Sequence, residues 1–349
     1  MQFARHTAIG IDIGSRTVKA AQLSTRGGDL RIVALSMCPR IKPGEPIDRD
    51  EIANTQGVLR RQGFTGTRIV LAVPDEQLLR GILELPPSAP GPAVAQMARM
   101  ELARIHHIEP QGFELVCWGQ PSSEPARSNV QTVAVACPHP VAHHLLDEFD
   151  QARLDVIALD ARTPAAARAC RTLAAAAPEI TAILDLGWST TKLLLMCGQT
   201  VIYERLLKSD LTSLTTVLSK RFKITQTAAS QIVDTIGVAS GKTPCELDPG
   251  TREALQAIML HHAQTVIEEL KVPFSYAAHQ VHSQGVKRLL LLGGGAGIAG
   301  LAEVLASTLE VEVLRAAPRD LVKCDGALVA SSENPALTVA VGLALFRGD

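Results

Sequence analysis

Aromatic residues are scarce in this sequence, and neither sign of charge is in excess. Phe, Trp and Tyr make up 3% of the 349 residues, and the formal net charge is −1. With so few stacking platforms and no surplus of positive charge, the chain is not expected to bind nucleic acid. The seven cysteines include no Cys-x-x-Cys pair, which argues against a disulfide framework and is typical of reduced thiols in a cytoplasm.

Long hydrophobic runs are also missing. A membrane-spanning helix needs about 18 consecutive apolar residues, and the best candidate, ALTVAVGLALF near the C-terminus, has 11. At the other end, Asp12 interrupts the first apolar stretch before the core of a signal peptide can form. We therefore expect no direct membrane insertion and a cytoplasmic location.

One pattern is present twice. Residues 8–24 read AIGIDIGSRTVKAAQLS, and residues 182–196 read AILDLGWSTTKLLLM. Each places an apolar strand before Asp, and then Gly, Thr and Lys follow at identical spacing. Because 349 residues exceed one ordinary hydrophobic core, the repeat predicts two related lobes that face each other across a cleft.

The composition of these turns suits an anion with a metal ion. Glycine and small hydroxyl residues expose consecutive backbone N–H groups that form a nest for phosphate oxygens. An aspartate beside a nest repels an anion unless a cation lies between them, and Mg²⁺ bridges carboxylates to phosphates. The predicted nucleotide-binding residues are Asp12, Gly14, Ser15, Thr17 and Lys19 in the first turn and Gly187, Ser189 and Thr190 in the second. Asp12 and Asp185 are the predicted metal ligands.

A glycine-rich stretch, LLLLGGGAGIAG at residues 289–300, follows in the second half. It contains the Gly-x-Gly-x-x-Gly fingerprint of dinucleotide-binding folds. The next strand, EVEVLRA, lacks the ribose-binding acid of that motif, and 49 residues after Gly300 are too few to complete such a fold. These features argue against a nicotinamide dehydrogenase. We expect Gly293, Gly294 and Gly295 to lie against a nucleoside instead.

Together these motifs resemble the actin-like ATPase superfamily. Asp12-Ile-Gly-Ser and Asp185-Leu-Gly look like its two phosphate turns, and the glycines of 293–297 look like its adenosine turn. Within it, the whole chain resembles the PilM family of type IV pilus assembly proteins, which are related to FtsA. The segments VLAVPDEQLLRGILELP, QTVAVACPHPVAHHLLDEFDQARLDVIALD and NPALTVAVGLALF fall where that family has similar ones.

The resemblance implies an α/β, ribonuclease H-like fold with two lobes, a nucleotide cleft and an inserted small α/β subdomain. The first lobe is expected at 1–165, with the insertion at about 75–155. The second lobe is expected at 166–349, with a helical subdomain at about 208–285. The C-terminal helix is assigned to the second lobe, with packing on the first lobe left open.

The function that the resemblance implies is a cytoplasmic, ATP-binding scaffold for assembly of a type IV pilus or a related secretion system. ATP and Mg²⁺ are the implied ligands, and slow ATP hydrolysis is the upper limit of any enzymatic activity. The implied partner is an inner-membrane assembly protein that docks a short cytoplasmic peptide on the inserted subdomain, so the chain would be peripheral to that membrane. Homo-oligomerisation is left open.

Two alternatives remain. In the PilM family a glutamate and a lysine on the helix after Arg205 hold the nucleoside, whereas here Ser230 and Val233 stand at those positions. An actin-like protein that no longer binds nucleotide would show such a loss. A small-molecule kinase of the same superfamily would need a catalytic aspartate in a substrate lobe, and no convincing signature of one is present.

Overall fold

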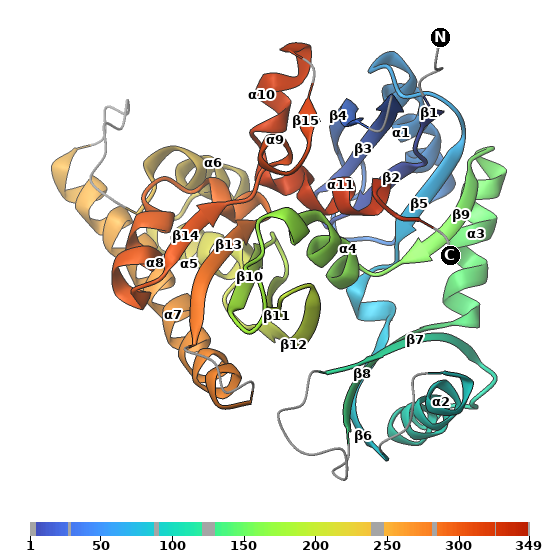
Figure 1. Ribbon diagram of the computed structural model, residues 1–349. Coiled ribbons are helices and arrows are strands. Elements are labelled where there is room, and N and C mark those ends of the chain that lie inside the picture. Colours follow the sequence, from blue (N-terminus) through green and yellow to red (C-terminus); the bar gives the residue numbers. More distant parts are fainter. Residues whose placement is uncertain are drawn as a thin grey trace.

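The computed structural model describes residues 5–26, 29–86, 91–120, 130–238, 248–280, 285–324 and 326–347. Two large mixed sheets form the centres of two lobes, and a smaller sheet lies below the first lobe (Figure 1). Among these residues, no single helix meets the length and hydropathy of a membrane span. The helical pieces Gly326–Ser332 and Pro335–Ala344 meet them only as a pair, with a bend of 93° between them.

The first lobe contains a seven-stranded sheet in the order β15-β4-β3-β2-β5-β9, with β1 paired to β3. Its strands are β1 (Arg5–His6), β2 (Ile9–Ile13), β3 (Thr17–Arg26), β4 (Asp29–Pro39), β5 (Arg68–Ala72), β9 (Asp155–Asp160) and β15 (Lys323–Cys324). β2, β3 and β4 form an antiparallel meander, and β5 and β9 continue from β2 in parallel. β5 is buried after its first residue, as expected for a central strand covered on both faces.

The second lobe repeats this topology. Its five strands are β10 (Ile180–Leu186), β11 (Thr191–Cys197), β12 (Thr200–Leu207), β13 (Val286–Leu292) and β14 (Glu312–Arg315). They lie in the order β12-β11-β10-β13-β14, with an antiparallel meander followed by two parallel strands. This matches the path β4-β3-β2-β5-β9 strand for strand, so the duplicated motif marks the start of a duplicated sheet.

Helices cover the sheets, and capping side chains fix where some of these helices begin. The helices of eight or more residues are α1 (Arg49–Arg61), α2 (Pro92–His106), α3 (His139–Gln151), α4 (Arg162–Ala169), α5 (Leu211–Phe222), α6 (Gln226–Ile236), α7 (Pro249–Gln280) and α8 (Leu301–Leu309). The shorter ones are α9 (Pro318–Leu321), α10 (Val329–Ser332) and α11 (Thr338–Ala344). Asp48 and Asp210 cap α1 and α5 by accepting backbone N–H bonds at 3.0 and 2.7 Å.

Two helices, α4 and α11, lie between the two large sheets (Figure 1). The core around them takes buried side chains from both lobes, among them Val70, Ala72, Ile183, Leu194, Leu290, Leu292, Val339 and Leu343. A Cβ on Gly342 of α11 would lie 2.6 Å from the carbonyl carbon of Ala165 in α4, and one on Gly10 of β2 would lie 2.8 Å from Leu343 Cβ. These glycines let backbone approach backbone. The C-terminal helix α11 therefore packs directly on the first lobe.

The third sheet is the inserted subdomain. Its strands β6 (Leu79–Leu85), β8 (Val130–Pro138) and β7 (Phe113–Gly119) are antiparallel, and α2 covers one face through Ala98 and Leu102. The following helix, α3, buries Leu145 and Phe149 in the core of the first lobe. The sheet and α2 span residues 79–138, and α3, which follows, packs in the core of the first lobe.

Candidate functional site

The two phosphate turns have the same local structure. Gly14 N–H donates to Thr17 O at 3.0 Å, and Gly187 N–H donates to Thr190 O at 2.9 Å. In the strand register, Asp12 lies opposite Lys19 and Asp185 lies opposite Lys192. Asp12 is fully buried and Asp185 is 7% exposed. The repeated spacing therefore produces two matching strand–turn–strand units at the ends of β2 and β10.

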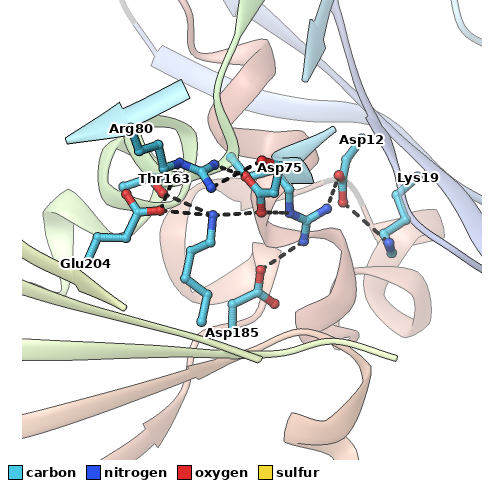
Figure 2. Close-up of polar contacts among 9 residues, drawn as sticks. Asp12, Lys19, Asp75, Arg80, Thr163, Asp185 and Glu204 are labelled. Atoms are coloured by element: carbon cyan, nitrogen blue, oxygen red, sulfur yellow. Dashed lines mark hydrogen bonds and ion pairs between the residues drawn. The ribbon is translucent and has the colours of Figure 1, made fainter. Parts of the chain in front are cut away.

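The two lysines of the repeat have different partners. Lys19 Nζ lies 3.4 Å from Asp12 Oδ2, its cross-strand neighbour. Lys192 Nζ instead lies 2.7 Å from Asp75 Oδ2 and 3.2 Å from Glu204 Oε1, and donates to Thr163 Oγ1 at 3.3 Å. Figure 2 shows Asp75 and Glu204 on this side of the cluster and Lys19 on the other. The first lysine stays in its own turn, and the second ties the second lobe to the first.

Arg162, in the first turn of α4, joins the two turns. Its Nη1 donates to Asp12 Oδ1 and its Nη2 donates to Asp185 Oδ2 at 2.9 Å. Its Nε lies 3.8 Å from Asp75 Oδ2. Arg80 extends the cluster because it contacts both Asp75 and, at 3.3 Å, Glu204 Oε1. Figure 2 shows the aspartates converging from separate elements.

The cluster holds eight charged groups of balanced sign. The acids are Asp12, Asp75, Asp185 and Glu204, and the bases are Lys19, Arg80, Arg162 and Lys192. We call these eight residues the cleft network. Every member has at least one partner of opposite charge, as buried ionised groups require.

The electrostatics keep three members of the network ionised. Burial alone would raise the pKa of Asp12, but Arg162 and Lys19 outweigh it and hold that pKa below its ordinary value. Burial likewise opposes ionisation of Asp75, yet Lys192, Arg80 and Arg162 lower its pKa to about 2. Burial would lower the pKa of Arg162, and the surrounding aspartates raise it instead. All three side chains are therefore charged at neutral pH.

The donor set between the turns does not fit the expected Mg²⁺. Asp12 and Asp185 do face each other, but the guanidinium of Arg162 occupies the space between their carboxylates. Within the part of the chain that the structure describes, no cluster of three or more His, Cys, Asp or Glu side chains could hold a metal ion. Among the described residues, the buried Asp185 Oδ1 has no hydrogen-bond partner.

The remaining predicted residues surround this centre. Ser15 and Thr17 are half-buried in the first turn, and Ser189 and Thr190 are exposed in the second. Gly293 has a φ of +79°, and a Cβ there would lie 2.5 Å from Asp185 Oδ1. A Cβ on Gly295 would lie 2.8 Å from Leu186 Cβ, whereas one on Gly294 would meet nothing. The glycine turn thus packs on the second phosphate turn.

Several residues of the site carry no sequence signal that we recognised. Arg16 stacks over the Trp188 ring, with Cζ 4.0 Å from the ring centroid, and donates to Ser230 Oγ at 2.9 Å. Arg40 donates to Gly14 O at 3.1 Å and to Glu51 Oε1 at 2.7 Å, so it links the first turn to helix α1. Arg16 is a basic residue inside the first turn and could have been noticed there, whereas Arg40 follows β4 and no local pattern marks it.

Val233 does not lie where the family comparison suggested. It is 3% exposed and packs in the hydrophobic core of the second lobe. Ser230, one turn earlier on α6, does reach toward the first lobe through its bond to Arg16. A buried valine at this position offers a nucleoside no polar contact.

Comparison with known proteins identifies the family. The sequence model described as type IV pilus assembly protein PilM matches residues 10–348. The chain belongs to the PilM family. Its structure is similar to that of the PilM–PilN type IV pilus biogenesis complex, with a TM-score of 0.78, 22% identity, and coverage of 97% of this chain and 98% of that one. No curated protein sequence matches the chain.

Other solved structures show the same fold at lower similarity. The ethanolamine utilization protein EutJ from Carboxydothermus hydrogenoformans gives a TM-score of 0.54 at 15% identity, with 98% of this chain and 90% of that chain covered. MreB5 of Spiroplasma citri, bound to AMPPNP, gives 0.53 at 12% identity, with 97% and 94% covered. The actin-like, two-lobed α/β fold and the PilM family, both predicted from the sequence, are confirmed.

Proposed function

We propose that this PilM-family protein is a cytoplasmic, ATP-binding scaffold for assembly of a type IV pilus or a related secretion system. The paired phosphate turns carry this proposal, because they share one hydrogen-bond pattern and their aspartates lie on either side of Arg162. Lys19 supplies positive charge at the first turn. The nucleoside would lie along the glycine turn at 293–295, where the second turn packs closely.

The nucleotide part can be tested directly. Denatured protein is analysed by mass spectrometry for released ATP or ADP, and ATP is titrated into the purified chain by calorimetry. We expect one site with a dissociation constant between about 10 µM and 1 mM. Lys19→Ala removes the charge beside the first turn and should weaken binding about tenfold. Lys287→Ala, an exposed lysine on β13, is the control.

The absence of released nucleotide, together with no heat up to about 1 mM ATP, would contradict this part and favour the actin-like protein that no longer binds nucleotide. Fast hydrolysis of ATP would instead contradict the role as a scaffold. An enzyme commonly turns over about ten times per second, and we expect hydrolysis far below that rate.

We propose further that an inner-membrane assembly protein docks a short cytoplasmic peptide on the inserted subdomain. The solved PilM–PilN complex supports a partner of this kind. The sheet face opposite α2 offers apolar side chains, because Ile82 is 46% exposed and Val116 is 59% exposed. Their cross-strand neighbours Val133 and Val135 lie on the same face.

A fluorescent peptide from the cytoplasmic segment of the cognate PilN-type protein tests this docking. The double substitution Ile82→Ser and Val116→Ser should weaken peptide binding about tenfold or more. Met100→Ser is the matched control. Met100 is a 53% exposed apolar residue of α2, the helix that covers the other face of the same sheet. Equal losses in both variants would place the interface elsewhere.

A further inference from the structure

The guanidinium of Arg162 lies where the sequence predicts a divalent cation. It donates to Asp12 Oδ1 and, at 2.9 Å, to Asp185 Oδ2, so it engages one carboxylate from each phosphate turn. A Mg²⁺ ion needs oxygen ligands at about 2.0–2.1 Å in an octahedron. One oxygen of each carboxylate, Asp12 Oδ1 and Asp185 Oδ2, already accepts a hydrogen bond from Arg162, so a metal ion placed between the two carboxylates would compete with the guanidinium for that space.

We propose that Arg162 is a resident counter-cation that takes the place of a divalent metal between the two phosphate turns, so that this cleft binds a nucleotide polyphosphate without a metal ion. Arg162 is then the residue that determines the metal requirement of the site. The nucleotide half of this statement rests on the function proposed above. The exclusion of a metal ion does not, and it can be tested alone.

The charge balance of the cleft network supports this assignment. Its four acids and four bases already cancel, and Arg162 is shared by Asp12, Asp185 and, at 3.8 Å, Asp75. In the absence of a nucleotide, adding a divalent ion would leave two surplus positive charges in a buried site. Expelling Arg162 to make room would remove the common partner of three buried carboxylates, and loss of one partner from a buried ion pair is strongly unfavourable.

The chemistry of arginine suits this role. Its planar fork presents five N–H donors in fixed directions and bridges carboxylates better than the point charge of lysine. The bonds to Asp12 and Asp185 use two of those donors, which leaves others that can also contact a phosphate oxygen. Burial would lower the pKa of Arg162, but the surrounding aspartates raise it, so its charge persists at neutral pH.

Manganese alone is the first probe, because Mn²⁺ resembles Mg²⁺ in size and ligand preference and free Mn²⁺ is counted by electron paramagnetic resonance. The wild-type protein should bind no Mn²⁺ in the cleft at concentrations up to about 1 mM. Arg162→Ala uncovers Asp12 and Asp185 and should create a site of about 100 µM or tighter. Adding Asp12→Asn to Arg162→Ala removes one ligand and should abolish that site again.

The second probe is ATP in the presence of either Mg²⁺ or a chelator. The affinity of the wild-type protein should differ by less than about threefold between the two conditions, whereas the affinity of Arg162→Ala should be at least about tenfold higher with Mg²⁺. Arg171→Ala removes an exposed arginine just after α4 and should behave as wild type. If Arg162→Ala does not fold by circular dichroism, Arg162→Gln, which fills more of the space, replaces it.

The outcomes separate the two proposals. Stoichiometric Mn²⁺ binding by the wild-type protein that Asp12→Asn abolishes would overturn the role of Arg162, as would a folded Arg162 variant that gains no Mn²⁺ site. If no variant binds ATP, the proposed nucleotide function fails and with it the metal-free nucleotide site. The Mn²⁺ measurements would then still decide whether Arg162 excludes a metal ion.

Discussion

Replacing Gly342 by alanine should destabilise the protein, although alanine is the better helix former. A Cβ at this position in α11 would lie 2.6 Å from the Ala165 carbonyl carbon and 3.2 Å from its Cα, whereas ordinary contacts begin at about 3.4 Å. The Ala165 carbonyl oxygen would lie closer still, so the helices would have to separate by about 1 Å or more. Arg168 Nη1 also donates to Gly342 O at 2.6 Å, which fixes the same backbone.

The magnitude follows from two opposing terms. Alanine in place of glycine inside a helix raises the free energy of unfolding by about 0.5–1 kcal/mol. Overpacking a close contact costs about 1–3 kcal/mol, and here the obstacle is backbone, which yields less than a side chain. We expect a net loss of at least about 1 kcal/mol in the free energy of unfolding.

The matched control is Gly57→Ala. Gly57 lies inside α1, and the nearest atom to a Cβ there is the flexible Arg61 Nη1 at 3.6 Å. The same substitution should therefore stabilise by about 0.5–1 kcal/mol. Urea unfolding followed by circular dichroism measures both. A Gly342→Ala protein as stable as wild type, beside a stabilised Gly57→Ala protein, would show that α4 and α11 are not held in backbone contact.

Three further predictions concern single side chains. The pKa of Asp75 is about 2 in the folded protein against an ordinary 3.8, so its ionisation adds about 2 kcal/mol to the free energy of unfolding. This contribution is fully present above pH 4 and is lost as the pH falls toward 2. The difference in stability between wild type and Asp75→Asn should therefore shrink over that range. Val233→Lys buries a charge in the second-lobe core and should lower stability by about 3 kcal/mol or more without tightening ATP binding, as thermal unfolding and calorimetry would show. Trp118→Phe removes the bond at 2.9 Å from Trp118 Nε1 to Val201 O and should cost about 1 kcal/mol; an unchanged melting temperature would show that this link between the insertion and the second lobe does not contribute to stability.

The sequence was informative wherever the signal was local or repeated. Aspartate, glycine, threonine and lysine at one spacing predicted two turns, and the structure gives both the same closing hydrogen bond. The repeat also predicted two related lobes, because a strand–turn–strand unit of this kind opens each sheet. The roles of the turn residues toward a nucleotide remain predictions.

Long-range partnerships could not be inferred in this way. Arg162 is 150 residues from Asp12 in the chain, and its position is set by where α4 passes between the sheets. No local pattern encodes that crossing. The resemblance places Val233 at the position of a lysine that holds the nucleoside in the family, but which face of α6 packs inward is decided by neighbouring helices of the second lobe. Such residues become visible only when the elements are assembled.

The chain crosses from one lobe to the other twice, and both crossings lie near the contact between α4 and α11. The first runs from β9 through α4 to β10, and the second leaves β14 and reaches β15 and α11 on the first lobe. A hinge made of two adjacent crossings in backbone contact permits rotation but resists sliding. The side chains buried around α4 and α11 are mostly apolar, whereas ion pairs between the lobes gather around Arg162 at the start of α4. We therefore expect a bound polyanion, which would meet these charges, to change the angle between the lobes by rotation about the contact of α4 with α11.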